Sequence, residues 1–140
     1  MSMTEVFADT SGWANYFIHS EPFYQTATRL MRQWQHEGTR VVTTNYVLAE
    51  LAALFISPLR LPRPQQIQVI ETICAASWIE LVHIDQTRHN RAWQVFKQYD
   101  DKMWSLVDCS SLAVMQERGI TQGFTTDHHF EQAGFLRLLR

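Results

Sequence analysis

Residues 4–13, TEVFADTSGW, decide the fold: they form an apolar run that ends in a carboxylate, two hydroxyls and a glycine. The run VFA at residues 6–8 predicts a short buried strand, because it is apolar and bounded by turn-forming residues. Asp9 then stands at the carboxyl end of that strand, which is where open α/β sheets bind their ligands. Two hypotheses follow: Asp9 belongs to a functional site, or one of residues 9–11 merely caps the next helix.

The composition predicts one folded domain covering residues 1–140, since 46% hydrophobic and 12% aromatic content is enough for a single core. No apolar run approaches the ~20 residues that a membrane helix needs, and no basic segment followed by an apolar stretch opens the sequence. We therefore expect a soluble, cytoplasmic protein that does not associate with a membrane. Cys74 and Cys109 lack the spacing of a metal or disulfide motif, and both are interpreted as packing residues.

The net charge does not decide whether the protein binds nucleic acid. A net charge of −2 and a pI near 6.3 argue against a broad basic surface for nucleic acid. A cluster of acids that binds a divalent cation would also lower the formal charge, however, without making the loaded site negative.

Along the chain, short apolar strands alternate with helical patterns, which is typical of a parallel sheet covered by helices. We expect strands at residues 6–8, 40–43, 78–84, 120–125 and, at an edge, 135–139. Helical patterns occupy the segments between them. Residues 57–64, SPLRLPRP, contain three of the four prolines and predict a loop between two helices.

One of these helices, at residues 87–99, carries cations outside its apolar stripe. They are Arg88, Arg91 and Lys97. The simplest interpretation is a solvated face, and the alternative is contact with the phosphates of a nucleic acid.

Three further acidic residues lie in settings like that of Asp9. Glu50 lies at the edge of the apolar stripe of the helix after the second strand, Asp108 near a helix start, and Asp127 after the fourth strand. If the first, second and fourth strands are neighbours, these carboxylates and Asp9 converge at one edge of the sheet.

Clustered carboxylates repel one another, so such a site needs protons or a cation, and hard oxygen ligands select Mg²⁺ or Mn²⁺. Ions held in this way assist phosphodiester hydrolysis, although the spacing alone also admits a phosphatase. A phosphoaspartyl enzyme would want a second aspartate where Ser11 stands. Zinc is disfavoured, because the adjacent His128 and His129 are expected to point apart.

Four motifs carry a resemblance to a known family: DTSGW at residues 9–13, LAEL at 48–51, DKMWSLVDCSSLAVM at 101–115 and TTDHHFEQAGF at 125–135. In this order they resemble a PIN domain, and most closely the VapC-type ribonuclease toxins of type II toxin–antitoxin systems. The resemblance covers the whole chain. It implies a three-layer α/β/α fold with a parallel sheet of four or five strands, and a Mg²⁺- or Mn²⁺-dependent endoribonuclease.

Carried over by position, the resemblance makes Asp9, Glu50, Asp108 and Asp127 the catalytic, metal-binding quartet. Asp9 and Asp108 would be the most direct ligands, Glu50 a ligand or a water-orienting base, and Asp127 a ligand partly through water. Hydroxyls that orient carboxylates or a phosphate would come from Thr10, Ser11, Ser105 and Thr126.

The resemblance also implies partners: an RNA substrate, a small antitoxin protein and a second copy of the chain in a homodimer. Two alternatives remain. One is a PIN nuclease that acts in RNA maturation or decay without an antitoxin. The other is a non-catalytic interaction module, whose acids would be helix caps and surface charges and which would bind no metal.

Overall fold

The computed structural model describes residues 4–140, which form five strands and seven helices. The strands are β1 (Glu5–Ala8), β2 (Arg40–Thr44), β3 (Ile79–Val82), β4 (Gln122–Phe124) and β5 (Leu136–Arg137). The helices are α1 (Thr10–Phe17), α2 (Tyr24–Glu37), α3 (Asn45–Ile56), α4 (Arg63–Ala75), α5 (Gln86–Gln98), α6 (Leu106–Arg118) and α7 (His129–Gln132). No helix within residues 4–140 is long and apolar enough to cross a membrane.

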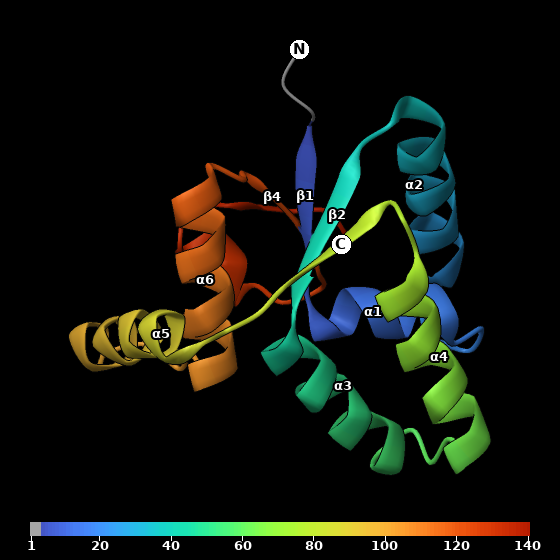
Figure 1. Cartoon of the computed structure of the whole chain (residues 1–140), viewed down its shortest axis with the longest axis horizontal. Helices are drawn as coiled ribbons and strands as arrows, with labels where there is room; N and C mark the ends of the chain where they lie inside the picture. The colour runs from blue at the N-terminus through green and yellow to red at the C-terminus, as the bar shows by residue number, and fades with distance from the viewer. Residues whose placement is uncertain (1–3) are drawn as a thin grey trace.

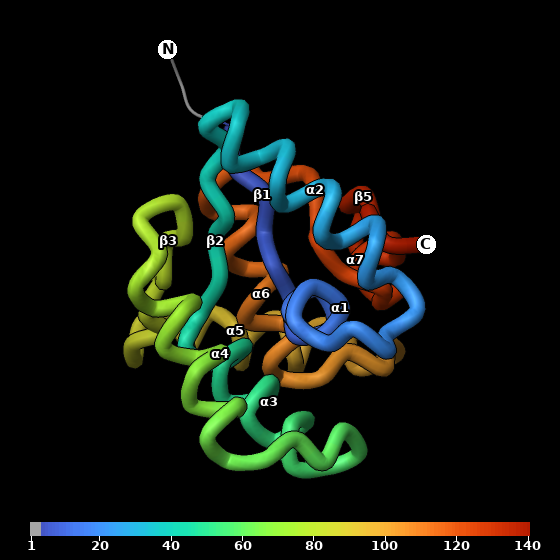
Figure 2. Tube along the Cα trace, turned by 90° about the vertical axis from the view of Figure 1, so that its right-hand side faces the viewer, coloured from blue at the N-terminus to red at the C-terminus, as the bar shows by residue number. Residues whose placement is uncertain are grey.

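The strands form one parallel sheet in the order β3-β2-β1-β4-β5. Helices α5 and α6 lie on one side of the sheet and α1, α2 and α4 on the other (Figure 1). The predicted three-layer α/β/α fold is therefore confirmed. The chain moves outward from β1 to β3 and returns to the other side of β1 for β4, so a crevice opens where the carboxyl ends of β1 and β4 meet. Figure 2 shows α1 directly after β1 at this edge.

The core anchors the strand that carries Asp9. Residues 6–8 are completely buried. The indole nitrogen of Trp13 donates to the hydroxyl of Thr43 at 3.1 Å, and that hydroxyl donates to the carbonyl of Ala8 at 3.0 Å. This chain of hydrogen bonds joins α1, β2 and β1 inside the core, so it fixes the backbone immediately before Asp9.

Gly12 allows the first turn of α1 to lie directly on the end of β4. The backbone N–H of Asp9 donates to the carbonyl of Phe124 at 3.2 Å. A β-carbon at Gly12 would stand only 2.0 Å from that same carbonyl oxygen. The glycine of the DTSGW motif is therefore a packing requirement, because no other residue permits this approach.

We expect Gly12→Ala to destabilise the fold by about 3 kcal/mol, at the upper end of overpacking costs, because the contact is with a backbone atom that cannot rotate away. Gly38→Ala is the control: Gly38 has φ of +77° but nothing within 4 Å of the added carbon, so only the backbone conformation costs energy, about 1 kcal/mol. Urea denaturation followed by circular dichroism measures both. Equal losses would contradict the packing role.

Some sequence expectations are wrong in detail. Cys109 is buried as predicted, but Cys74 is exposed, because α4 turns Ile73 and Gln66 inward. Helix α4 begins at Arg63, inside the expected proline loop, since Pro64 is well tolerated in a first turn. The edge strand β5 is also shorter than expected, with two residues.

Candidate active site

Each of the four predicted carboxylates lines one hollow of about 700 Å³ at the carboxyl edge of the sheet. Asp9 follows β1, Glu50 lies in α3, Asp108 in the first turn of α6, and Asp127 between β4 and α7. Segments far apart in the sequence thus supply acids to a single site.

Asp9 is the most deeply buried of these acids, with 4% of its surface exposed. It occupies the cap position of α1, but its side chain makes no capping hydrogen bond, so the hypothesis that its carboxylate caps the helix is wrong. Its Oδ2 accepts a hydrogen bond from the Thr125 hydroxyl at 3.1 Å. Its Oδ1 is buried and, within residues 4–140, has no hydrogen-bond partner. A buried carboxylate oxygen without a partner is costly, so this atom is available to a ligand.

Burial raises the pKa of Asp9 from 3.8 to about 7, with smaller contributions in the same direction from the charges of Glu50 and Asp108. The backbone N–H of Thr10 and the hydroxyl of Thr125 act in the opposite direction. Without a cation, the folded protein therefore holds Asp9 protonated for about half of the time near pH 7, whereas an ordinary aspartate is fully charged there.

Glu50 is half-buried and accepts a short hydrogen bond from the Thr10 hydroxyl. Its pKa is raised, first by burial and then by the nearby charges of Asp108 and Asp127. Two neighbouring acids with raised pKa values indicate a site that gains stability when positive charge enters it.

Asp108 lies in the first turn of α6 and forms a capping box with Ser105. The Ser105 hydroxyl accepts from the Asp108 N–H at 3.0 Å, and the Ser105 N–H donates to Asp108 Oδ2 at 3.0 Å. This places the carboxylate at the N-terminus of α6, where the positive end of the helix dipole attracts negative charge. The structural and the functional hypotheses for Asp108 are thus compatible.

His129 bridges two of the acids. Its Nδ1 lies 3.1 Å from Asp108 Oδ2 and 3.2 Å from Asp127 Oδ1, and its backbone N–H donates to Asp127 Oδ1 at 2.9 Å. The expectation that His128 and His129 point apart is wrong: their ring centroids are 4.5 Å apart. His128 already has helical φ and ψ at the start of α7, so the side chains diverge by about 100° and not by 180°.

Hydroxyl groups hold the carboxylates in place. The Thr10 hydroxyl donates to the Glu50 carboxylate. Ser105 holds the Asp108 carboxylate through its backbone N–H, while its hydroxyl accepts from the Asp108 N–H. Ser11 acts through Thr125: its hydroxyl lies 3.0 Å from the Thr125 hydroxyl, and it accepts a hydrogen bond from the Thr126 N–H at 2.9 Å. The hydroxyl that reaches Asp9 belongs to Thr125, which sequence reasoning missed in favour of Thr126. The paired threonines after β4 were the signal, but only the strand register decides which one points inward.

None of the three cations suggested for phosphate contact, Arg88, Arg91 and Lys97, lines the acidic hollow, and two of them pair with an acid on α6. Arg88 and Arg91 lie 3.7 and 3.4 Å from Glu117 carboxylate oxygens. Glu117 is nine residues after Asp108 in α6, about 13 Å along the helix. This face stabilises the packing of α5 on α6 and does not line the acidic hollow.

The donor set fits a hard divalent cation. The hollow offers carboxylate oxygens from four residues, one of them the unpartnered Oδ1 of Asp9. Oxygen donors of this kind suit Mg²⁺, Mn²⁺ or Ca²⁺. Atoms of Asp127, His128 and His129 also approach within 4.8 Å of one another, so imidazole nitrogen is available at the rim.

The protein is a three-layer α/β/α protein with acidic residues gathered where the strand order of its parallel sheet reverses. Sequence comparison specifies the family. A profile of the PIN domain matches residues 6–136, so this chain belongs to the PIN domain family. It is 29% identical over 133 residues to a curated relative, the 23S rRNA-specific endonuclease VapC20 of Mycobacterium tuberculosis. The alignment covers 95% of this chain and 97% of the relative.

Solved structures agree on the fold. The crystal structure of Mycobacterium tuberculosis VapC20, described as a sarcin-ricin loop cleaving toxin, superimposes with a TM-score of 0.81 at 27% identity, covering 94% of this chain and 96% of that one. VapBC2 from Rickettsia felis, solved with a promoter DNA fragment, gives 0.67 at 11% identity and covers 96% of each chain. FitAcB from Neisseria gonorrhoeae gives 0.62 at 12% identity, covering 94% of this chain and 95% of that one. The last two support the fold alone.

Proposed function

We propose that this protein is a Mg²⁺- or Mn²⁺-dependent endoribonuclease and the toxin of a type II toxin–antitoxin system. The observation that carries the proposal is the convergence of Asp9, Glu50, Asp108 and Asp127 in one hollow of a PIN domain, with a buried oxygen of Asp9 left without a partner. The likeness to VapC20 over nearly the whole chain supports the toxin role.

In this proposal Asp9 and Asp108 hold the ion most directly, and Glu50 and Asp127 complete its surroundings. The bound ion would supply Lewis-acid polarisation of the phosphate and neutralisation of charge. Thr125 and Ser105 keep the carboxylates of Asp9 and Asp108 oriented through the hydrogen bonds already described.

Glu50 is the group proposed to take a proton from water, and His129 is proposed to position two of the acids. Glu50 lies in the hollow with a raised pKa, which suits a general base that orients and deprotonates a water molecule. The Nδ1 of His129 lies 3.1 Å from a carboxylate oxygen of Asp108 and 3.2 Å from one of Asp127, so this ring can position the two acids relative to each other.

The proposed substrate is a structured RNA with an exposed loop, by analogy with the rRNA specificity of VapC20. Proposed partners are a small antitoxin protein and a second copy of this chain, and the proposed location is the cytoplasm. Of the alternatives, a housekeeping PIN nuclease would share the site but lack the antitoxin.

An RNA hairpin carrying the sarcin-ricin loop, end-labelled and compared with a fully paired duplex of the same length, tests the activity. We expect one discrete cut in the loop in the presence of Mg²⁺ or Mn²⁺, little cleavage with Ca²⁺, and none with EDTA. Cleavage mapped on a sequencing gel measures this. Cleavage that persists in EDTA would contradict the metal-dependent mechanism, and equal cutting of the duplex would contradict loop recognition.

A further inference from the structure

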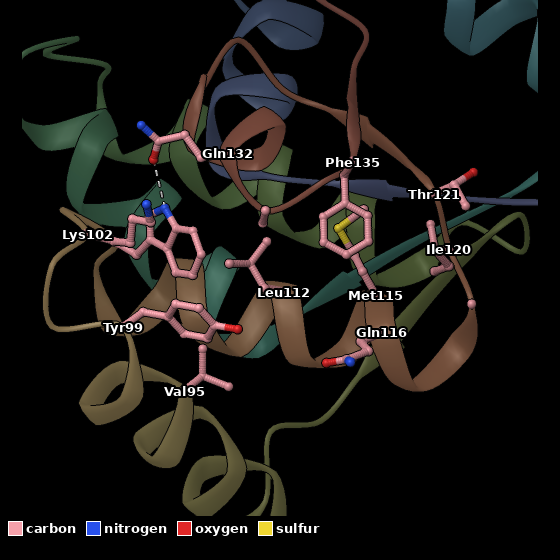
Figure 3. A pocket seen from close by; sticks show the side chains of 13 residues that line it. Val95, Tyr99, Lys102, Leu112, Met115, Gln116, Ile120, Thr121, Gln132 and Phe135 are labelled. Atoms are coloured by element: carbon pink, nitrogen blue, oxygen red, sulfur yellow. Dashed lines mark hydrogen bonds between the residues drawn. The ribbon is translucent and has the colours of Figure 1, made fainter.

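A second hollow, of about 390 Å³, opens beside the acidic one between α5, α6 and the segment from α7 to β5. Its floor is apolar and comes largely from Leu112, Met115 and Phe135 (Figure 3). Its volume lies within the ~300–1,000 Å³ typical of small-molecule sites. Neither the acidic quartet nor its supporting hydroxyls contribute to this hollow.

The two hollows share their dividing wall. Along the segment before α6, Met103 and Ser105 line the acidic hollow, while Lys102 and Trp104 line the second one. The short helix α7 contributes in the same way: His129 faces the acids, and residue 132, one turn later, faces the second hollow. The second hollow is therefore within reach of a polymer bound across the acids.

Two aromatic residues, Tyr99 and Trp104, line the second hollow beside the wall that it shares with the acidic hollow. Tyr99, 40% exposed, lies against the buried Trp104 with ring centroids 4.9 Å apart and planes inclined by 42°. The indole N–H of Trp104 donates to the Gln132 side-chain oxygen at 3.0 Å, which holds that ring in position (Figure 3). Because Trp104 is fixed and Tyr99 is partly open, a flat ligand can contact the tyrosine ring without rearrangement of the core.

The second hollow also has a positively charged residue close to these aromatic residues in the sequence. Lys102 lines the hollow, and its ammonium lies 3.6 Å from Asp101, in a pair of exposed neighbours. Exposed pairs of this kind are weak, so the lysine can exchange its partner for a phosphate at little cost. An aromatic face next to a cation is the combination by which proteins bind single-stranded RNA.

We propose that this second hollow binds an unpaired nucleobase next to the phosphodiester that is cut, with Tyr99 against the face of the base and Lys102 on an adjacent phosphate. The inference rests on the proposed function and adds a specificity determinant to it. A purely apolar occupant, such as a protein side chain, would use the floor but would gain nothing from the lysine.

Two variants and two matched controls test the proposal with the full-length protein and the loop hairpin. Tyr99→Leu and Lys102→Gln are expected to raise KM about tenfold while kcat stays within twofold, in line with the loss of one stacked base or one phosphate contact. Trp93→Leu and Lys97→Gln, on α5 and outside the hollow, are expected to leave both constants unchanged.

A second test of the nucleobase site uses hairpins that contain one abasic nucleotide. Placed in turn at each nucleotide flanking the cut, it should raise the wild-type KM about tenfold at one position and have no further effect on Tyr99→Leu, because the base and the ring form one contact. If the wild type cuts the hairpin but both variants keep its KM, the nucleobase site is wrong and the nuclease proposal stands. If the wild type cuts no RNA with Mg²⁺ or Mn²⁺, the proposed function itself is wrong.

Discussion

Asp108→Asn is expected to fold normally and to lose nearly all metal-dependent RNA cleavage, by roughly 10²–10⁴-fold, if the ion contributes several kcal/mol to the transition state. Asparagine keeps the shape of the side chain and an oxygen that can accept from the Ser105 N–H, so the start of α6 survives. It cannot supply the negative charge that a divalent ion requires. Without metal, the variant should melt at or above the wild-type temperature, because one repulsive charge has been removed.

The cleavage rate of the loop hairpin in Mg²⁺ and the metal-free melting temperature together measure this prediction. Asp101→Asn is the matched control, because Asp101 belongs to the same sequence motif but is exposed and pairs only with Lys102 among the described residues. It should retain wild-type activity. If Asp108→Asn also cut RNA at close to the wild-type rate, Asp108 would be a helix cap and no more.

Asp9→Asn is expected to stabilise the metal-free protein at alkaline pH. The raised pKa means that the folded protein holds a proton on Asp9 more tightly than the unfolded chain does. The stability that this proton contributes is complete below pH 3.8, the ordinary pKa, and is lost as the pH rises to about 7. Above that pH the buried carboxylate is charged, so its replacement by a neutral amide should recover up to about 4 kcal/mol, the equivalent of three pKa units.

Urea denaturation of wild type and Asp9→Asn in EDTA, at pH 5 and pH 8, measures the difference. The gain should be clearly larger at pH 8. Cleavage activity should be lost in the same variant, since the ligand is gone. A variant less stable than wild type at pH 8 would show that the carboxylate is not strained in the absence of metal.

The gathering of the four acids in one hollow could be predicted from the sequence, because three of them lie near a feature that a pattern reveals. Asp9 directly follows β1, Asp127 lies three residues after the end of β4, and strand ends meet at one edge of a parallel sheet. Asp108 lies three residues after a serine, in the pattern of a capping box. The α/β class followed from the alternation of strand and helix patterns, which depends on local periodicity alone.

Other features depend on register and tertiary contact, which no local pattern contains. Thr125 and Thr126 are identical in type, and only the pairing of β4 with β1 turns the first toward Asp9. His129, the first residue of α7, reaches Asp108 through a tertiary contact between segments 21 residues apart in the sequence. The inward face of α4 was misjudged for a similar reason: polar and apolar residues are mixed around that helix, and its buried residues include the polar Gln66, so the packing against its neighbours decides which face is turned inward.

Titration of Mn²⁺ into the metal-free protein at pH 8 tests most directly whether the four carboxylates form a cation site. Calorimetry should give saturable binding, and a hundredfold excess over Kd should add about 2.7 kcal/mol of stability, or roughly 10 °C in Tm. Both effects should be absent in Asp9→Asn. An unchanged wild-type Tm, or equal binding by the variant, would contradict the account.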